Sequence, residues 1–197
     1  QGALSVVLLV GAGLFVRSLS NVEGVRLGFD VDPVLFVNLN MRGVKLDSAQ
    51  TVELRLRLLQ TAKTIPGVEN VSLQAAVPFW NHWSTSLYVQ GIDTVARLGQ
   101  FNLNAVSSEY FSTVGTRVLR GRGITDQDTP NSPRAMVVSE AMGKVLWPAR
   151  DRIGQCAKVN ADTMPCTYVV GIAENIKDQN IGADSIYYYY VAAMQFN

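Results

Sequence analysis

GALSVVLLVGAGLFV, residues 2–16, is the stretch that decides how the chain is organised, because it contains no charged side chain. As a helix rising about 1.5 Å per residue it would extend about 22 Å, less than the roughly 30 Å of a bilayer's hydrocarbon core. The chain also begins inside this run, without a methionine. The run therefore predicts the C-terminal part of a truncated transmembrane helix over residues 1–20, followed by a folded region over residues 21–197.

Three other interpretations of residues 2–16 stay open at this point. A secretory signal peptide has a basic segment before its apolar run, and none is present. A buried core helix is common for runs of about 10–14 apolar residues. A dinucleotide-binding loop is imitated by VVLLVGAG, residues 6–13, but Val16 stands at the third glycine position and is too bulky for the close packing of that motif.

The charge balance excludes several classes of partner. The chain has 17 basic and 16 acidic side chains, a net charge of +1, so it carries no electrostatic footprint for nucleic acid and no polybasic membrane patch. It has no Walker-type loop for ATP. The residues after position 20 are enough for one large domain or two small lobes.

Two cysteines, Cys156 and Cys166, indicate the compartment. No histidine lies near them for a zinc site, and their spacing is not that of a CxxC redox motif. The residues between them read as a strand, an Asn/Asp turn and a return, so the cysteines would face each other at the open end of a hairpin. A disulfide here would remove chain entropy worth about 2.7 kcal/mol and place the domain outside the cytoplasm; two free buried thiols are the alternative.

Hydrophobic patterning predicts a β–α–β unit after the apolar run. Val34–Leu39 reads as a buried strand, Asp47 with Gln50 as a capping box, the residues up to Ile65 as a helix with an apolar stripe, and Val68–Leu73 as the next strand. Further strands are expected over 86–89, 101–106, 135–138, 167–172 and 187–190, short helices after Ser107 and Ser139, and a loop over 120–123.

The sequence offers no catalytic, cofactor-binding or metal-binding residues. His82 lies between two tryptophans in PFWNHW, residues 78–83, but no acidic residue or cysteine lies within eight positions of it. Asp126, Asp128 and Glu140 occupy turn and cap positions. We therefore predict a structural or interfacial loop, with Trp80 and Trp83 as candidate contacts. In the run of four tyrosines one pair is expected in the core and one at a rim, which makes Tyr187 and Tyr190 further candidates.

The order of several short motifs is similar to a known family. They are VGAGLFVRSL (10–19), GFD (28–30), PGVE (66–69), SSEYF (107–111), LRGRG (119–123), VVSEA (137–141), LWP (146–148) and IG (153–154). In this order they resemble the MacB-like periplasmic core domain of ABC-transporter permeases, in the FtsX/MacB superfamily. The segment 156–170, which contains ADTMPC, most resembles the branch called acidobacterial duplicated orphan permeases.

This resemblance implies an α+β fold, with a porter-like lobe of β–α–β units and a smaller lobe inserted within about Gln74–Leu103. It implies a bacterial inner (cytoplasmic) membrane protein whose soluble part lies in the periplasm or outside the cell. The domain itself would not be an enzyme and would need no cofactor.

The implied partners are membrane lipid around the N-terminal helix, a cytoplasmic ABC ATPase that hydrolyses the ATP, and a second permease copy or a periplasmic adaptor. The implied work is export or mechanotransmission. An extracytoplasmic sensor or ligand-binding domain of a membrane receptor is the alternative. Further membrane spans after Asn197 would indicate a permease, and signalling modules there would indicate a receptor. An anchored enzyme would need clustered carboxylates or a nucleophile with a base, which the sequence does not offer.

Overall fold

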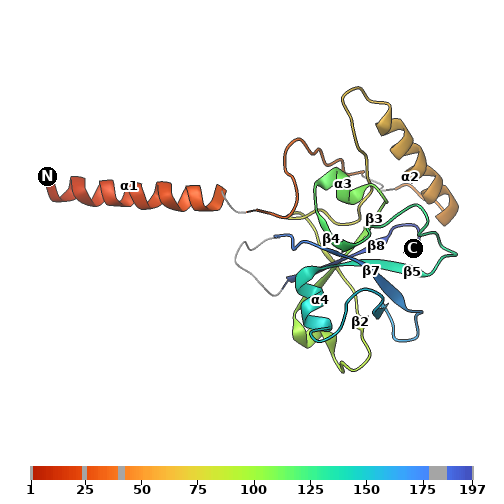
Figure 1. The fold of residues 1–197 in the computed structure, drawn as a ribbon. Helices are drawn as coiled ribbons and strands as arrows, with labels where there is room; N and C mark the ends of the chain where they lie inside the picture. The colour runs from red at the N-terminus through yellow and green to blue at the C-terminus, as the bar shows by residue number, and fades with distance from the viewer. Residues whose placement is uncertain (1, 24–25, 40–42, 178–185, 197) are drawn as a thin grey trace.

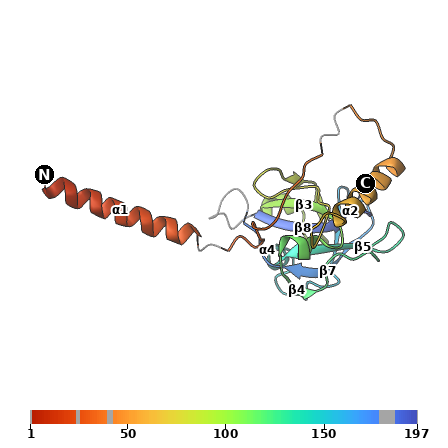
Figure 2. The ribbon, with the colours of Figure 1, turned by 90° about the horizontal axis from the view of Figure 1, so that it is seen from above.

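The first element of the fold is a helix that extends away from a folded body (Figures 1 and 2). The structure is a computed structural model and describes residues 2–23, 26–39, 43–177 and 186–196. Helix α1 (Gly2–Glu23) contains one stretch, Gly2–Asn21, that is long and apolar enough to cross a membrane by length and composition, and none of it is buried. Its 20 residues span about 30 Å at about 1.5 Å per residue.

The observed helix is longer than the uncharged run because the helical backbone continues past Arg17 to Glu23. A long arginine stem near the end of a span can lie along apolar surface while its charge reaches water. A buried core helix and a dinucleotide-binding loop are both wrong for residues 2–16, since the segment is one exposed helix.

The body is built on one eight-stranded mixed sheet in the order β1-β3-β8-β5-β7-β6-β2, with β4 paired to β7. Pairs β3·β8 and β5·β7 are parallel, whereas β5·β8 and β6·β7 are antiparallel. The predicted α+β class is confirmed. The strands are β1 (Trp83–Ser84), β2 (Leu87–Tyr88), β3 (Gln100–Val106), β4 (Val118–Gly121), β5 (Arg134–Ser139), β6 (Cys156–Val159), β7 (Thr167–Ala173) and β8 (Ile186–Ala192).

Two apolar clusters cover the two faces of the central strands. Val138 of β5 belongs to one cluster and Val137 to the other, because successive strand residues point to opposite faces. The first cluster includes α4 (Glu140–Leu146), and the second includes α3 (Tyr110–Val114). The remaining helices are α2 (Ser48–Lys63) and the 3₁₀ helix η1 (Val95–Leu98).

Two local predictions are confirmed in the body. Cys156, the first residue of β6, and Cys166, directly before β7, form a disulfide with their Cα atoms 5.4 Å apart. Ser139 caps α4, because the backbone N–H of Met142 donates to the Ser139 hydroxyl at 3.3 Å. Both features depend on short stretches of sequence.

The predicted β–α–β unit is not formed as expected. The helix is present, and Asp47 and Gln50 make both hydrogen bonds of the capping box. Neither Val34–Leu39 nor Val68–Leu73 is a strand, however, since among the described residues no strand pairs with either. An extended backbone becomes a strand only when a neighbour satisfies its N–H and C=O groups. We call residues 31–39 and 43–73 the arm.

Two smaller expectations are also wrong. Ser107 does not cap α3; its hydroxyl instead accepts a hydrogen bond from the backbone N–H of Leu73 at 2.9 Å. Residues 120 and 121, expected in a loop, belong to β4, where they pair with Ile172 and Gly171 of β7. In both cases a long-range partner overrides the local signal.

Candidate functional site

The short segment after α1, residues 26–30, is attached to the body by hydrogen bonds, and we call it the docking segment. The backbone N–H of Lys177 donates to the Leu27 carbonyl at 2.8 Å, and the N–H of Asp30 donates to the Val114 carbonyl at 2.7 Å. The hydroxyl of Thr116 donates to the Gly28 carbonyl at 2.8 Å. Residues 26–30 are therefore held by the last residue of α3 and by the segments that follow α3 and β7.

A buried carboxylate reinforces this attachment. Glu174, 7% exposed and directly after β7, accepts hydrogen bonds from Arg26 Nε at 3.0 Å and Nη2 at 3.1 Å. It also accepts from the backbone N–H of Arg117 at 2.8 Å and from its guanidinium Nη2 at 2.9 Å. One carboxylate therefore links the docking segment to the start of β4.

The protonation state of Glu174 follows from these contacts. Burial acting by itself would raise the pKa of the Glu174 carboxyl, but the hydrogen bonds from Arg117 and Arg26 outweigh it and lower the pKa to about 2. The side chains of Arg26 and Arg117 are 58% and 60% exposed, so water screens both pairs. At neutral pH Glu174 is thus a charged carboxylate, and both of its oxygens accept hydrogen bonds.

Two glycines allow the close approach of the docking segment to the body. Gly28 has a φ of +82°, and a side chain there would collide with the backbone of Asn175 and Ile176. Gly115 has a φ of +70°, and a side chain there would overlap the carboxylate of Asp30. L-residues with a Cβ rarely adopt these φ values, so both positions require glycine for conformation as well as for space.

The acidic residues that the sequence singled out have structural partners. Asp128 accepts two hydrogen bonds from Arg122, at 2.7 and 2.8 Å. Burial raises the pKa of Asp128, but the bonds from Arg122 outweigh it and leave the pKa lowered. Asp126 accepts from the Ser108 hydroxyl at 2.6 Å, and Glu140 pairs with Lys144 one helical turn on. Within the described residues, no group of three or more His, Cys, Asp or Glu could hold a metal ion.

The aromatic candidates separate into an exposed pair and a buried pair. Trp80 is 67% exposed and lines an apolar groove with Leu27 and Phe36, whereas Trp83 is 58% exposed and lines a different pocket. Tyr187 and Tyr190 are 7% and 0% exposed. The expectation of a tyrosine pair at a rim is wrong, because β8 lies between β3 and β5 and both of its faces are covered.

Sequence patterns did not indicate the residues that form the attachment. Arg26 and Glu174 are 148 positions apart, and Arg117 and Glu174 are 57 apart. No motif connects residues at such distances, and each is an ordinary charged residue in its own segment. GFD, residues 28–30, is the one local signal, because a glycine before a strand-like run marks a turn.

Comparison with known proteins gives a family match over nearly the whole chain. Residues 2–197 match the family model described as "MacB-like periplasmic core domain". The solved periplasmic region of MacB from Actinobacillus actinomycetemcomitans aligns with a TM-score of 0.52 and 17% identity, and the match covers 71% of this chain and 55% of that chain. At this identity the likeness supports the fold alone.

Two further solved structures are similar at lower scores. The extracellular domain of the noncanonic ABC-type transporter YknZ from Gram-positive bacteria aligns with a TM-score of 0.49 and 21% identity, covering 68% of this chain and 60% of that one. A domain of a putative permease protein from Porphyromonas gingivalis gives 0.46 and 12%, covering 72% and 52%. This chain therefore spans little more than half the length of the solved structures it resembles, and no curated protein matches it.

Proposed function

The chain belongs to the family of MacB-like periplasmic core domains, which makes it an extracytoplasmic domain of a MacB/FtsX-type ABC permease, and we propose that it transmits movement of its membrane helix. The movement would pass from α1 through the docking segment into the sheet. The family is one of non-catalytic domains, so the proposed work is a transfer of position and not of chemical groups.

The attachment of residues 26–30 carries this proposal. Arg26 is the first described residue after α1, and it is bound by Glu174, which lies directly after β7. Strand β7 pairs with β4, β5 and β6, so a force on its end is shared by half of the sheet. Protein interiors are close-packed and have low compressibility, so a displacement at one end of a strand is passed on to its neighbours.

The wider assembly follows from the same reasoning. We propose that membrane lipid surrounds the apolar helix over residues 1–20, that residues 21–197 form the periplasmic core domain with two lobes, and that a cytoplasmic ABC ATPase supplies the energy. A second permease copy or a periplasmic adaptor would receive the movement, with Trp80 and Trp83 as the contacts that are exposed. The relation to the acidobacterial duplicated orphan permeases rests on residues 156–170 and is part of this proposal.

Bilayer thickness offers a direct test, since a membrane helix changes its tilt when the hydrocarbon core becomes thinner or thicker. Spin labels would be attached to cysteines introduced at Ser18 in α1 and at the exposed Gln127 in the body, and the distance between them measured by pulsed EPR. The labelled chain would be studied in nanodiscs of short- and long-chain lipids. If α1 and the body move as a unit, the distance distribution stays the same across the series.

Matched variants separate transmission from general loosening. Gly28→Ala and Glu174→Gln act on the attachment and should broaden the distribution, whereas Gly67→Ala, at a φ of +85° with nothing within 4 Å of a Cβ, should not. A distribution in the unmodified pair that changes with bilayer thickness would overturn the proposal, because the helix would then tilt without moving the body.

The receptor-type sensor remains the second candidate function. It shares the apolar helix and the disulfide with the permease interpretation, and it needs a ligand pocket in place of a coupling surface. Family membership favours the permease.

A further inference from the structure

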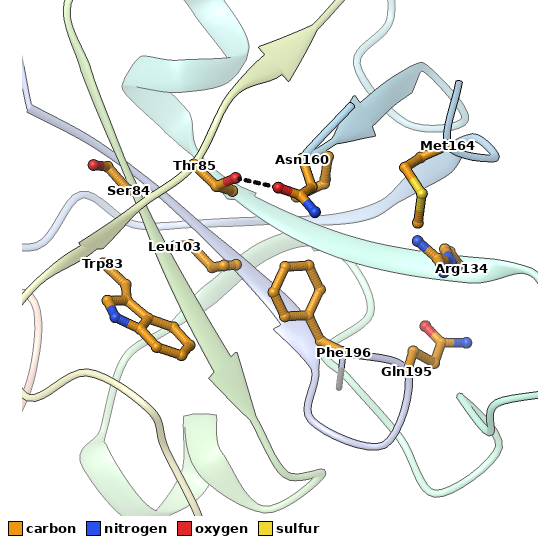
Figure 3. A pocket seen from close by; sticks show the side chains of 10 residues that line it. Trp83, Ser84, Thr85, Leu103, Arg134, Asn160, Met164, Gln195 and Phe196 are labelled. Atoms are coloured by element: carbon orange, nitrogen blue, oxygen red, sulfur yellow. Dashed lines mark hydrogen bonds between the residues drawn. The ribbon is translucent and has the colours of Figure 1, made fainter. Parts of the chain in front are cut away.

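A pocket on the body lies where the two edges of the sheet approach each other (Figure 3). Leu103 of β3 and Val159 of β6 both line it, although β8, β5 and β7 separate these strands in the sheet order. The sheet must therefore curl for the two strands to meet at one cavity. The mouth of such a curled sheet is a common place for a small-molecule site.

The shape of the pocket is maintained by bonds within the protein. The Thr85 hydroxyl donates to Asn160 Oδ1 at 3.2 Å, which links the segment after β1 to the turn after β6 (Figure 3). Asn160 itself has a φ of +82°, a conformation that asparagine tolerates better than most residues. Gln195 closes another side, with its Nε2 donating to the Ser132 hydroxyl at 3.0 Å and its Oε1 accepting from the N–H of Ala135 at 3.0 Å.

The polar part of the lining carries a positive charge and no negative one. Arg134 is the single charged residue in the lining, and none of the carboxylates in the described part of the chain forms an ion pair with it. The Asn160 oxygen accepts from the Thr85 hydroxyl, and the Asn160 side-chain NH₂ group can donate to a ligand. The Ser84 hydroxyl, which also lines the pocket, can donate or accept. A cation and neutral donors, with no acid among them, fit a ligand that accepts hydrogen bonds and carries negative charge.

The remaining walls are apolar, which narrows the ligand class. Leu103, Val159, Met164 and Phe196 line the cavity together with the ring of Trp83. The volume is about 260 Å³, below the range of about 300–1,000 Å³ that is typical of sites for drug-sized molecules. A phosphate dianion would place two charges beside one arginine and leave the apolar walls unused.

We propose that this pocket binds a small monocarboxylate that bears an apolar group. The carboxylate accepts hydrogen bonds from the Arg134 guanidinium, whose planar fork matches the two oxygens. Asn160 donates at one side, and the hydrocarbon part lies against Leu103, Met164 and the ring of Trp83. This goes beyond the proposed transmission of movement, because it assigns a ligand site to a domain that needs none for mechanical work.

The test uses the whole chain in nanodiscs of zwitterionic lipid and sodium hexanoate as the probe. The indole N–H signal of Trp83, assigned with Trp83→Phe, is followed by NMR during the titration, and the buried Trp147 serves as an internal reference. Hexanoate should shift the Trp83 signal in a saturable way and leave the Trp147 signal in place. Hexylamine, which has the same chain but a positive head group, should give no saturable shift.

Variants at Arg134 identify the cation. Arg134→Gln should raise the Kd for hexanoate about tenfold or more, because a hydrogen bond between two charged groups is replaced by a weaker one from a neutral amide. Arg134→Lys should recover part of the affinity, and the exposed Arg150→Gln should leave the Kd unchanged. Leucine should bind more weakly than N-acetyl-leucine, because the lining offers its ammonium group no carboxylate.

The proposal is overturned if hexanoate binds wild type and Arg134→Gln with the same Kd. It is also overturned if hexylamine binds as well as hexanoate does, a comparison that needs no variant and so does not depend on the folding of Arg134→Gln. Empty nanodiscs of the same lipid provide the correction for partition of the probe into the bilayer.

Discussion

The arm and the sheet body have similar hydrophobic sequences but very different burial. In the body, Ile172 is 2% exposed and Tyr190 is fully buried, whereas in the arm Leu35 is 85% exposed and Ile65 is 52% exposed. No described residue of α2 is buried, although its apolar residues are spaced as in a packed helix. The difference shows that an apolar pattern gives a segment a surface that can be buried. Whether that surface is buried depends on the presence of another element that packs against it.

The largest expected effect comes from truncating the same residue type in the two regions. Ile172→Ala should lower the free energy of unfolding of the body by about 2–5 kcal/mol, because it leaves a cavity in a close-packed core. Ile65→Ala, in the arm, should change it by about 0.5 kcal/mol or less. Urea unfolding in micelles, followed by the fluorescence of buried tryptophan, measures both. Equal losses would mean that the arm is packed in solution.

Removing the disulfide should give the next largest effect and should act on the body. The bond closes a loop from Cys156 to Cys166, so the double variant Cys156→Ser/Cys166→Ser should lose about 2–3 kcal/mol in the loop-closure model. The total helical content, measured by circular dichroism in the absence of urea, should stay the same, because α2 lies outside the body. Wild type treated with reductant provides the control and should unfold like the double variant; full stability without the bond would contradict the model.

The loss of stability caused by Glu174→Gln should depend on pH. We compare it with the loss caused by breaking an exposed charged pair in the arm. The pKa of Glu174 is lowered to about 2 in the folded chain, below its ordinary value of about 4.3. A lowered folded pKa adds stability that is fully present above the unfolded pKa and is lost as pH falls from about 4.3 toward 2. Urea unfolding at neutral pH should show wild type about 1–2 kcal/mol more stable than Glu174→Gln, after allowance for screening by water.

The control for this prediction is Glu53→Gln, which breaks the exposed pair with Arg57 on α2. It should cost only about 0.2–0.5 kcal/mol. Near pH 2 the advantage of wild type over Glu174→Gln should shrink to almost nothing. An advantage that does not depend on pH would show that the carboxylate charge is not what stabilises the attachment.

The smallest expected effect on the body comes from the capping box of the arm. Asp47→Ala should destabilise α2 by about 1 kcal/mol, because Asp47 accepts from the N–H of Gln50 at the helix start. Hydrogen exchange over residues 48–63 should become faster, while the urea midpoint of the body should not move. Asp93→Ala, at an exposed turn, serves as the control, and a shift of the midpoint in Asp47→Ala alone would show that α2 supports the sheet.

Predictions that depend on a few neighbouring residues were accurate. The helix from Gly2, the capping box at Asp47, the cap at Ser139 and the strands β3, β5, β7 and β8 are all present, with ends within a few residues of those expected, except that the apolar helix runs on to Glu23. The disulfide could be predicted because both cysteines belong to one hairpin. The failures at Val34–Leu39 and Ser107 concern segments whose state depends on a distant partner. In the described part of the chain no strand pairs with Val34–Leu39, and Ser107 bonds to Leu73 in place of capping α3.

The amino-acid sequence contains enough to establish the apolar helix, the oxidised cysteine pair, the class of the fold and, through the order of its motifs, the family. The helix, the cysteine hairpin and each single motif arise from side chains that are close along the chain, and the family follows from the order of the motifs. The contact of Arg26 and Arg117 with Glu174, the burial of all four tyrosines of β8 and the pocket around Arg134 arise only when the strands take their places. Each brings together residues far apart in sequence, and their meeting depends on strand order and on the curl of the sheet.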